Sequence, residues 1–180
     1  MVIMRLPKAF RQISVLLMKP LTEQEIRAAF VNCTKGEAKR LTVPRDLADR
    51  PWEDLDYLGW RDPQSPGRAY LVTEAGGRLG ALALRRPAAG AGQGRRSMCR
   101  ICLTAHDGGV SLMVAAKAGK AGQQGNSVGV YMCDDLACSL YVRGMKEAGP
   151  GARLPETLTL EEKIERTVAN LAAFVAKVTA

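Results

Sequence analysis

The residues of this sequence best suited to chemistry are four of its five cysteines. Cys99 and Cys102 form a C-x2-C pair, and Cys133 and Cys138 form a C-x4-C pair further along the chain. Two close thiols on a tight turn can bind one face of a metal ion, and a second pair at the first turn of a helix can complete a tetrahedron. The spacing therefore predicts one structural Zn2+ held by four thiolates, with no open position for catalysis.

Two different roles for these cysteines stay open. A single C-x2-C pair also occurs in thiol oxidoreductases, and cysteines can pack in a core without a ligand. A redox site has no use for a distant second pair, which favours the metal. His106 could replace one cysteine, but we expect it in a loop beside 107–109. Cys33 has no cysteine neighbour in the sequence, and we expect it to be a core residue.

The elements that must position these thiols follow from the pattern around them. Strands are predicted at 110–115 and 127–132, joined by a loop rich in lysine and glycine at 117–126. A helix is predicted beyond Cys133. A cysteine knuckle, a hairpin and a ligand-bearing helix, in this order, make a treble-clef finger. A last helix is predicted from a Thr159 capping box, and its apolar stripe consists of Leu160, Ile164, Val168, Leu171, Val175 and Val178.

The part of the chain before the cysteines has mixed helical and strand signals. A capping box at Thr22 predicts a helix whose apolar face continues to Cys33, and a short second helix is expected at 36–40. Strands are expected at 69–73 and 78–85 as a hairpin. The predicted fold class is α+β. The predicted parts are a flexible extension 1–19, a mixed α/β part 20–86, a linker 87–94, and a treble-clef zinc finger with C-terminal helix 95–180.

Positive charge gathers in one stretch of the chain. The net charge of the protein is +8, and residues 85–120 carry seven basic side chains against Asp107 alone. Three of them, Arg95, Arg96 and Arg100, are expected to offset the charge of a zinc–thiolate centre. Such a stretch attracts nucleic acid, a ribosome surface or an acidic protein face, although a solvated loop has the same composition. No apolar run approaches the roughly 18 residues that a membrane span needs, so we expect no membrane partner.

Catalysis has little support in the sequence. His106 is the single histidine, and the acidic stretch 53–62 comes without a nucleophile or a metal-ligand set. We therefore expect that the protein is not an enzyme. Five cysteines without a secretory signal indicate a reducing compartment, which predicts a cytoplasmic location.

The cysteine region also resembles a known family. It is similar to the C-terminal treble-clef zinc-finger domain of the elongation-factor-G-binding proteins, the FusB-type or FBP-domain family connected with fusidic acid resistance. The residues that carry the resemblance are Met98–Cys102, Val110–Met113, Gly125–Cys133 and Cys138. Residues 18–85 look like the shorter FBP-domain members. The resemblance implies one structural zinc ion and docking on elongation factor G or the ribosome, with release of the factor when the drug traps it there.

The resemblance also implies partner-binding residues. Met113 stands where the resistance proteins have an aromatic residue, and Tyr131 matches a tyrosine two positions before the third zinc ligand. Lys117 and Lys120 could meet acidic groups of the partner. Ordinary strand packing is the alternative for Met113 and Tyr131. The resistance proteins have a helical N-terminal domain, so factor binding by a monomer is expected here rather than drug resistance itself.

A second function stays open at this point. The basic stretch 85–120 could bind ribosomal or other RNA through a zinc finger of the same kind. RNA affinity would fall steeply with salt and would follow the number of arginines. A factor-docking surface would depend more on Met113 and Tyr131.

Overall fold

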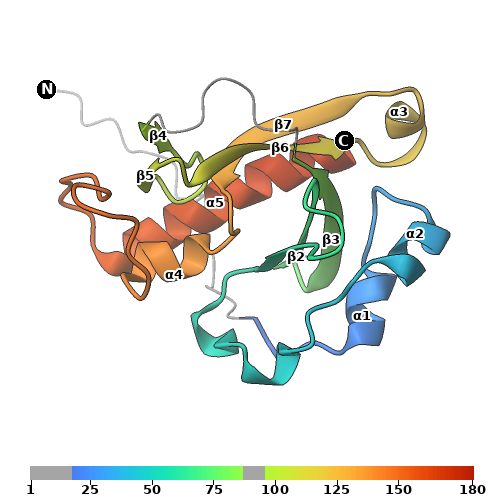
Figure 1. Ribbon diagram of the computed structural model, residues 1–180, viewed down its shortest axis with the longest axis horizontal. Helices are drawn as coiled ribbons and strands as arrows, with labels where there is room; N and C mark the ends of the chain where they lie inside the picture. The colour runs from blue at the N-terminus through green and yellow to red at the C-terminus, as the bar shows by residue number, and fades with distance from the viewer. Residues whose placement is uncertain (1–17, 87–95) are drawn as a thin grey trace, which may run out of the picture.

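The computed structural model describes residues 18–86 and 96–180 (Figure 1). Most of the predicted extension and all of the predicted linker 87–94 lie outside the described residues. Met18, which the predicted extension includes, is instead buried, and its amide donates to the Leu55 carbonyl at 3.1 Å. The elements before the linker are α1 (Glu23–Ala28), α2 (Lys35–Arg40), the 3-10 turns η1 (Leu47–Asp49) and η2 (Trp52–Asp54), β1 (Leu58–Arg61), β2 (Arg68–Ala75) and β3 (Arg78–Arg85). Those after it are β4 (Arg96–Met98), β5 (Ala105–Asp107), β6 (Val110–Ala116), α3 (Gly119–Gln123), β7 (Ser127–Cys133), α4 (Cys138–Arg143) and α5 (Leu160–Thr179).

One antiparallel sheet runs through both predicted parts of the chain. Its strand order is β1-β2-β3-β6-β7, and β4 and β5 form a separate two-stranded ribbon. The strands on either side of the linker meet over two residue pairs only, Leu84 with Ala115 and Arg85 with Val114. The α+β class is confirmed, and the mixed part and the finger share a sheet.

Each face of the sheet carries its own hydrophobic core. The metal-side core contains the four cysteines, Leu71, Leu84, Met113, Met132, Leu171, Phe174 and Val178. The N-terminal core contains Ile26, Trp52, Leu58, Trp60, Tyr70 and Val72. Because side chains alternate along a strand, β2 supplies Leu71 to one core and Val72 to the other, which explains its unbroken apolar run. Figure 1 shows α5 along one side of β6 and β7, with α1 and α2 on the other side of β2 and β3.

The C-terminal helix begins where the capping box predicts. The Thr159 hydroxyl accepts from the Glu162 amide, and α5 then continues for 20 residues. The stripe that it buries is Ile164, Thr167, Leu171, Phe174 and Val178. This stripe is rotated from the predicted one, since Leu160 is exposed and Val168 and Val175 lie at its margin.

The first helix is shorter than its apolar pattern predicts. It ends at Ala28 because the following residues pair with the free edge of β3: the Ala81 amide donates to Ala29 O at 2.8 Å, and the Val31 amide donates to Ala81 O at 3.0 Å. The Asn32 side chain extends this pairing by exchanging hydrogen bonds with the backbone of Ala83. Sheet hydrogen bonds therefore outweigh helix propensity here.

The predicted loop 117–126 contains a short helix, α3. Glycine is required at 122, because a Cβ there would collide with the Lys117 carbonyl oxygen. Among the described residues, none of the helices combines the length and apolar character that crossing a membrane requires.

Candidate metal centre

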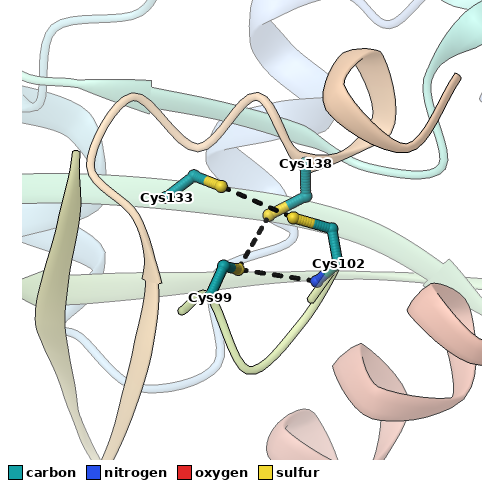
Figure 2. Close-up of side chains that lie close together, drawn as sticks. All are labelled: Cys99, Cys102, Cys133 and Cys138. Atoms are coloured by element: carbon teal, nitrogen blue, oxygen red, sulfur yellow. Dashed lines mark hydrogen bonds between the residues drawn. The ribbon is translucent and has the colours of Figure 1, made fainter. Parts of the chain in front are cut away.

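Four cysteine sulfurs, two from the turn between β4 and β5 and two from the β7–α4 connection, converge at one point (Figure 2). Their Sγ atoms all lie within 4.8 Å of one another, and every one of these cysteines is buried. Cys99 Sγ is 3.6 Å from Cys138 Sγ, and Cys102 Sγ is 3.5 Å from Cys133 Sγ. The two predicted pairs therefore form one cluster.

The first pair sits on a tight turn between β4 and β5. The Cys99 amide donates to the Thr104 carbonyl at 2.9 Å, and the Leu103 amide donates to the Cys99 carbonyl at 3.0 Å. Leu103 has a φ of 58°, in the left-handed region, which reverses the chain after Cys102. The turn directs the amides of Ile101 and Cys102 at the Cys99 sulfur, at 3.3 and 3.5 Å.

The second pair spans the end of β7 and the start of α4. Cys133 is the last residue of the strand and Cys138 the first of the helix. Asp135 holds the loop between them: its carboxylate accepts from the Ala137 amide at 3.1 Å and from the Tyr141 hydroxyl at 2.9 Å. Burial alone would raise the pKa of Asp135, but hydrogen bonds from Lys146, Ala137 and Tyr141 outweigh it and lower the pKa.

The donor set and its dimensions fit a zinc ion. A tetrahedral Zn–S distance of roughly 2.3 Å places sulfurs about 3.8 Å apart, close to the two separations above. Four soft thiolates without a nearby carboxylate ligand select zinc over hard cations. All four positions are occupied by protein, so the ion would supply folding energy to the metal-side core.

The thiols already interact strongly with one another. Hydrogen bonds from the neighbouring cysteine thiols, Cys102 first, lower the pKa of Cys99. The thiol of Cys133 in the same way lowers the pKa of Cys102. Burial raises the pKa of Cys138. Such a cluster binds a cation in place of the shared protons.

His106 is a neighbour of the cluster. It lies on β5 and is buried, so its predicted place in a loop is wrong. Its Nε2 is 3.3 Å from Cys133 Sγ, and its ring meets Tyr141 edge-on at 4.7 Å. Burial lowers the pKa of His106, so the ring is neutral at pH 7. With Nε2 protonated, His106 donates to the Cys133 thiolate. Cys133 and Cys138 supply the second pair of ligands themselves, so His106 does not replace either of them.

Three charged contacts that the sequence analysis missed join the metal loop to the first part of the chain. Asp134, next to a ligand, accepts from Arg61 at 2.9 Å and pairs with Arg86 at 2.5 Å. Arg143 of α4 makes a bidentate pair with the buried Asp56, at 2.7 and 2.9 Å. The carboxylates at 56 and 134 stand next to aromatic and cysteine residues, but only the tertiary fold shows their arginine partners.

The predicted partner-binding residues separate into buried and exposed positions. Tyr131 is 53% exposed on the outer face of β7, directly opposite Leu112 on β6. Lys120 is exposed and Lys117 half-buried. Met113 is 0% exposed inside the metal-side core. The prediction that Met113 contacts a partner is therefore corrected. Side chains alternate along β6, so Met113 lies in this core and Leu112 lies on the outer face.

The sequence predicts that three arginines of the basic stretch offset the charge of the metal centre, and the structure describes two of them. Arg96 donates to the Gly151 carbonyl, Arg100 is exposed, and Arg95 lies outside the described residues. Arg166 of α5 is the cation whose pKa the Cys102 sulfur raises, after a larger effect from Glu156. Arg166, from the C-terminal helix, thus lies near the Cys102 sulfur.

A cysteine knuckle, a β-hairpin and a helix that carries the fourth ligand define a treble-clef zinc-finger protein. The chain belongs to the FBP C-terminal treble-clef zinc-finger family, whose model matches residues 25–178. The match includes the strands before the linker as well as the finger. No curated protein matches the chain. Among solved structures, the chain is similar to the fusidic acid resistance protein FusC, with 17% identity and a TM-score of 0.49, over 80% of this chain and 54% of that one. The chain thus spans about half the length of FusC.

Proposed function

We propose that this zinc-binding protein docks on translation elongation factor G through the outer face of its β6–β7 hairpin. Membership of the FBP family supports a role of this kind. The observation that carries the proposal is the exposure of Tyr131 on this face, because a large tyrosine left open on a rigid strand is a typical interface anchor.

The surroundings of Tyr131 support a protein partner. Leu112 lies opposite it, and Val114 and Gly129 continue the same face. The Leu112 side chain lies across Gly129, where a Cβ would be 3.0 Å from Leu112 Cδ1. Lys120 on α3 adds positive charge at the far end of the hairpin. An apolar strip with basic residues at its rim suits a partner surface that is itself apolar and acidic.

Other parts of the proposal follow from the same chemistry. The role is binding without catalysis, because four thiolates leave the metal no open position. All five cysteines lie in the described part of the chain and are free thiols, which supports a reducing cytoplasm as the location. Promotion of factor release from the ribosome is the activity that we expect to follow from docking.

Isothermal titration of purified elongation factor G tests the docking. Tyr131→Ala should weaken binding about tenfold or more, as loss of an anchor residue does, while zinc content stays unchanged. Val31→Ala is the matched control, because Val31 is also a large exposed side chain, 41% accessible, and lies on the N-terminal part. Equal affinity of wild type and Tyr131→Ala, or no binding by wild type at micromolar concentration, would contradict the proposal.

RNA binding is the second candidate, supported by the exposure of Arg85, Arg96 and Arg100. The backbone of Arg100 donates to the Tyr131 carbonyl at 2.8 Å, so this arginine lies beside the proposed docking face. Affinity for ribosomal RNA that falls steeply between low and high salt, and that Arg100→Ala weakens more than Tyr131→Ala, would favour this candidate.

A further inference from the structure

The hydroxyl of Tyr57 is a buried polar group without a partner. Tyr57 directly precedes β1 and is 1% exposed within the metal-side core. Its oxygen has no hydrogen-bond partner among residues 18–86 and 96–180. A buried hydroxyl without an acceptor is costly, and a phenylalanine would fill the same space without that cost. The hydroxyl therefore needs an acceptor among the groups next to it.

Tyr57 lies against the fourth cysteine of the cluster. The residue before it, Asp56, donates its amide to the hydroxyl of Ser139, the residue after Cys138, at 3.0 Å. Asp56 also binds Arg143 one turn further along α4. These contacts fix the segment before β1 along the start of α4. After burial, the Cys138 sulfur is the strongest cause that raises the pKa of Tyr57.

The ring of Tyr57 packs closely over Gly59. A Cβ added at Gly59 would lie 3.0 Å from Tyr57 Cε2 and 2.5 Å from the Leu136 side chain. Glycine at 59 thus leaves the space in which the ring and Leu136 pack between β1 and the metal loop. Tyr57 is thus held in the same buried cluster as the four cysteines.

The other three sulfurs each have a polar neighbour from outside the cysteine side chains. Cys99 accepts from the backbone amides of its own turn. The Thr104 hydroxyl is 3.3 Å from Cys102 Sγ, and the His106 ring is 3.3 Å from Cys133 Sγ. Within the described residues, Cys138 Sγ contacts the Cys99 thiol at 3.6 Å and makes no hydrogen bond to a group outside the cysteine side chains. One sulfur thus lacks a polar neighbour outside the cluster, and one buried hydroxyl lacks an acceptor.

We propose that Tyr57 donates a hydrogen bond to the Cys138 thiolate of the metal-loaded site and so completes its outer shell. Each of the four sulfurs then has a polar neighbour outside the cysteine side chains, and the hydrogen bond from Tyr57 draws charge away from a centre whose net charge is −2 with four thiolates and one zinc ion. Tyr57 belongs to the first part of the chain, so that part contributes directly to metal affinity. This inference rests on the metal site and is independent of any docking partner.

Competition with a chromophoric zinc chelator tests the proposal on the full-length protein. Tyr57→Phe keeps the ring and removes the hydroxyl, and it should lower zinc affinity about tenfold, the smaller effect seen for outer-shell residues. Tyr70→Phe is the matched control: it removes another buried hydroxyl, bonded to Asp62 at 3.0 Å in the N-terminal core. The control should leave zinc affinity unchanged. Unchanged affinity in Tyr57→Phe, or equal losses in both variants, would overturn the proposal.

A measurement on the wild type keeps the test valid should Tyr57→Phe fail to fold. Loaded with 113Cd, the wild-type protein should show a slowly exchanging tyrosine hydroxyl proton with scalar coupling to the metal through the sulfur. Zinc-loaded Tyr57→Phe, where it folds, should also react faster with an alkylating agent than wild type, because its Cys138 thiolate has lost a hydrogen bond. A Tyr57 hydroxyl proton that exchanges at the rate of exposed hydroxyls and shows no coupling would overturn the proposal.

Discussion

The two cores cover opposite faces of one sheet and are stabilised in different ways. The metal-side core has the 20-residue α5 and a buried cysteine cluster. Among residues 18–86, the N-terminal core has two α-helices of six residues each, and side chains that bond to backbone carbonyls fix its irregular segments. The Trp60 indole donates to Thr42 O at 2.8 Å, and Arg27 donates to the carbonyls of Ala38, Lys39 and Leu41.

This difference shows how a small protein stabilises segments that are too short to be helices on their own. Helices of six residues are unstable in isolation, so each needs its capping box and its tertiary contacts. The connection from Cys133 to Cys138 also leads into a helix of six residues, α4. There the cysteine cluster, rather than a long helix, fixes the chain. Local hydrogen bonds suffice on one face, whereas the other depends on an ion.

Removal of the metal should have the largest effect, and it should destabilise the metal-side core far more than the N-terminal core. Cys138→Ser, or exposure to a strong chelator, removes a contribution on the order of 10 kcal/mol, comparable to the whole unfolding free energy of a domain. The metal-side core should lose fixed packing, seen as loss of near-ultraviolet circular dichroism and of amide protection in β6 and β7. Cys33→Ser, outside the cluster, is the control and should retain zinc. Full protection in metal-free protein would contradict this account.

The next largest effect concerns the ion pair between the two parts. Asp56→Ala leaves the Arg143 charge buried without its carboxylate and should cost about 3–5 kcal/mol in chemical denaturation. The exposed pair of Arg50 and Asp46 is the control, and Asp46→Ala should cost under about 1 kcal/mol. Equal costs for the two variants would show that burial of the pair is unimportant.

Asn32 tests the attachment of the first helix to the sheet. Its amide donates to Ala83 O and Ala116 O at 2.9 and 3.0 Å and accepts from Ala83 N at 2.8 Å. Asn32→Ala should cost about 2 kcal/mol in urea, because it leaves backbone groups without partners. The Ala83 amide should also exchange faster. Asn126→Ala, at an exposed loop position, is expected to be neutral.

The capping-box carboxylates of the N-terminal core should contribute the smallest change, and acid should remove that contribution. Hydrogen bonds with Thr22 and Thr34 lower the pKa values of Glu25 and Glu37 below the ordinary 4.5. A lowered folded-state pKa means that this stabilisation is present above 4.5 and is lost as pH falls through the lowered value. Denaturation midpoints at about pH 7 and about pH 3.5 should differ less in Glu25→Gln/Glu37→Gln than in wild type. Glu53→Gln, at an exposed position, should keep the wild-type difference.

The sequence predicts what depends on local chemistry. The four ligands, the capping boxes at Thr22 and Thr159 and the hairpin strands are all visible as short-range patterns of residue type. Each is fixed by interactions between residues close in sequence, or by cysteines whose spacing suits few sites besides a metal centre. The α+β class and the treble-clef order follow from these patterns.

The remaining features depend on contacts between distant segments. Nothing in the local pattern shows that β3 pairs with β6, because the two strands meet over two residue pairs across the linker. Strand alternation alone does not say which face of β6 is covered, so the sequence leaves Met113 a candidate contact residue although it packs against α5. Tyr57 and His106 join the metal site only after the sheet and the ribbon have formed.

The Asn32 side chain makes hydrogen bonds that a neighbouring strand would otherwise make. Where β3 diverges from β6, the Asn32 carboxamide offers the same donor and acceptor pattern as a peptide group, and it bridges the two separating backbones. Exposed strand edges invite pairing with other chains. The amide therefore seals a gap at which intermolecular β-pairing would otherwise begin, and its loss should first become visible as self-association at high protein concentration.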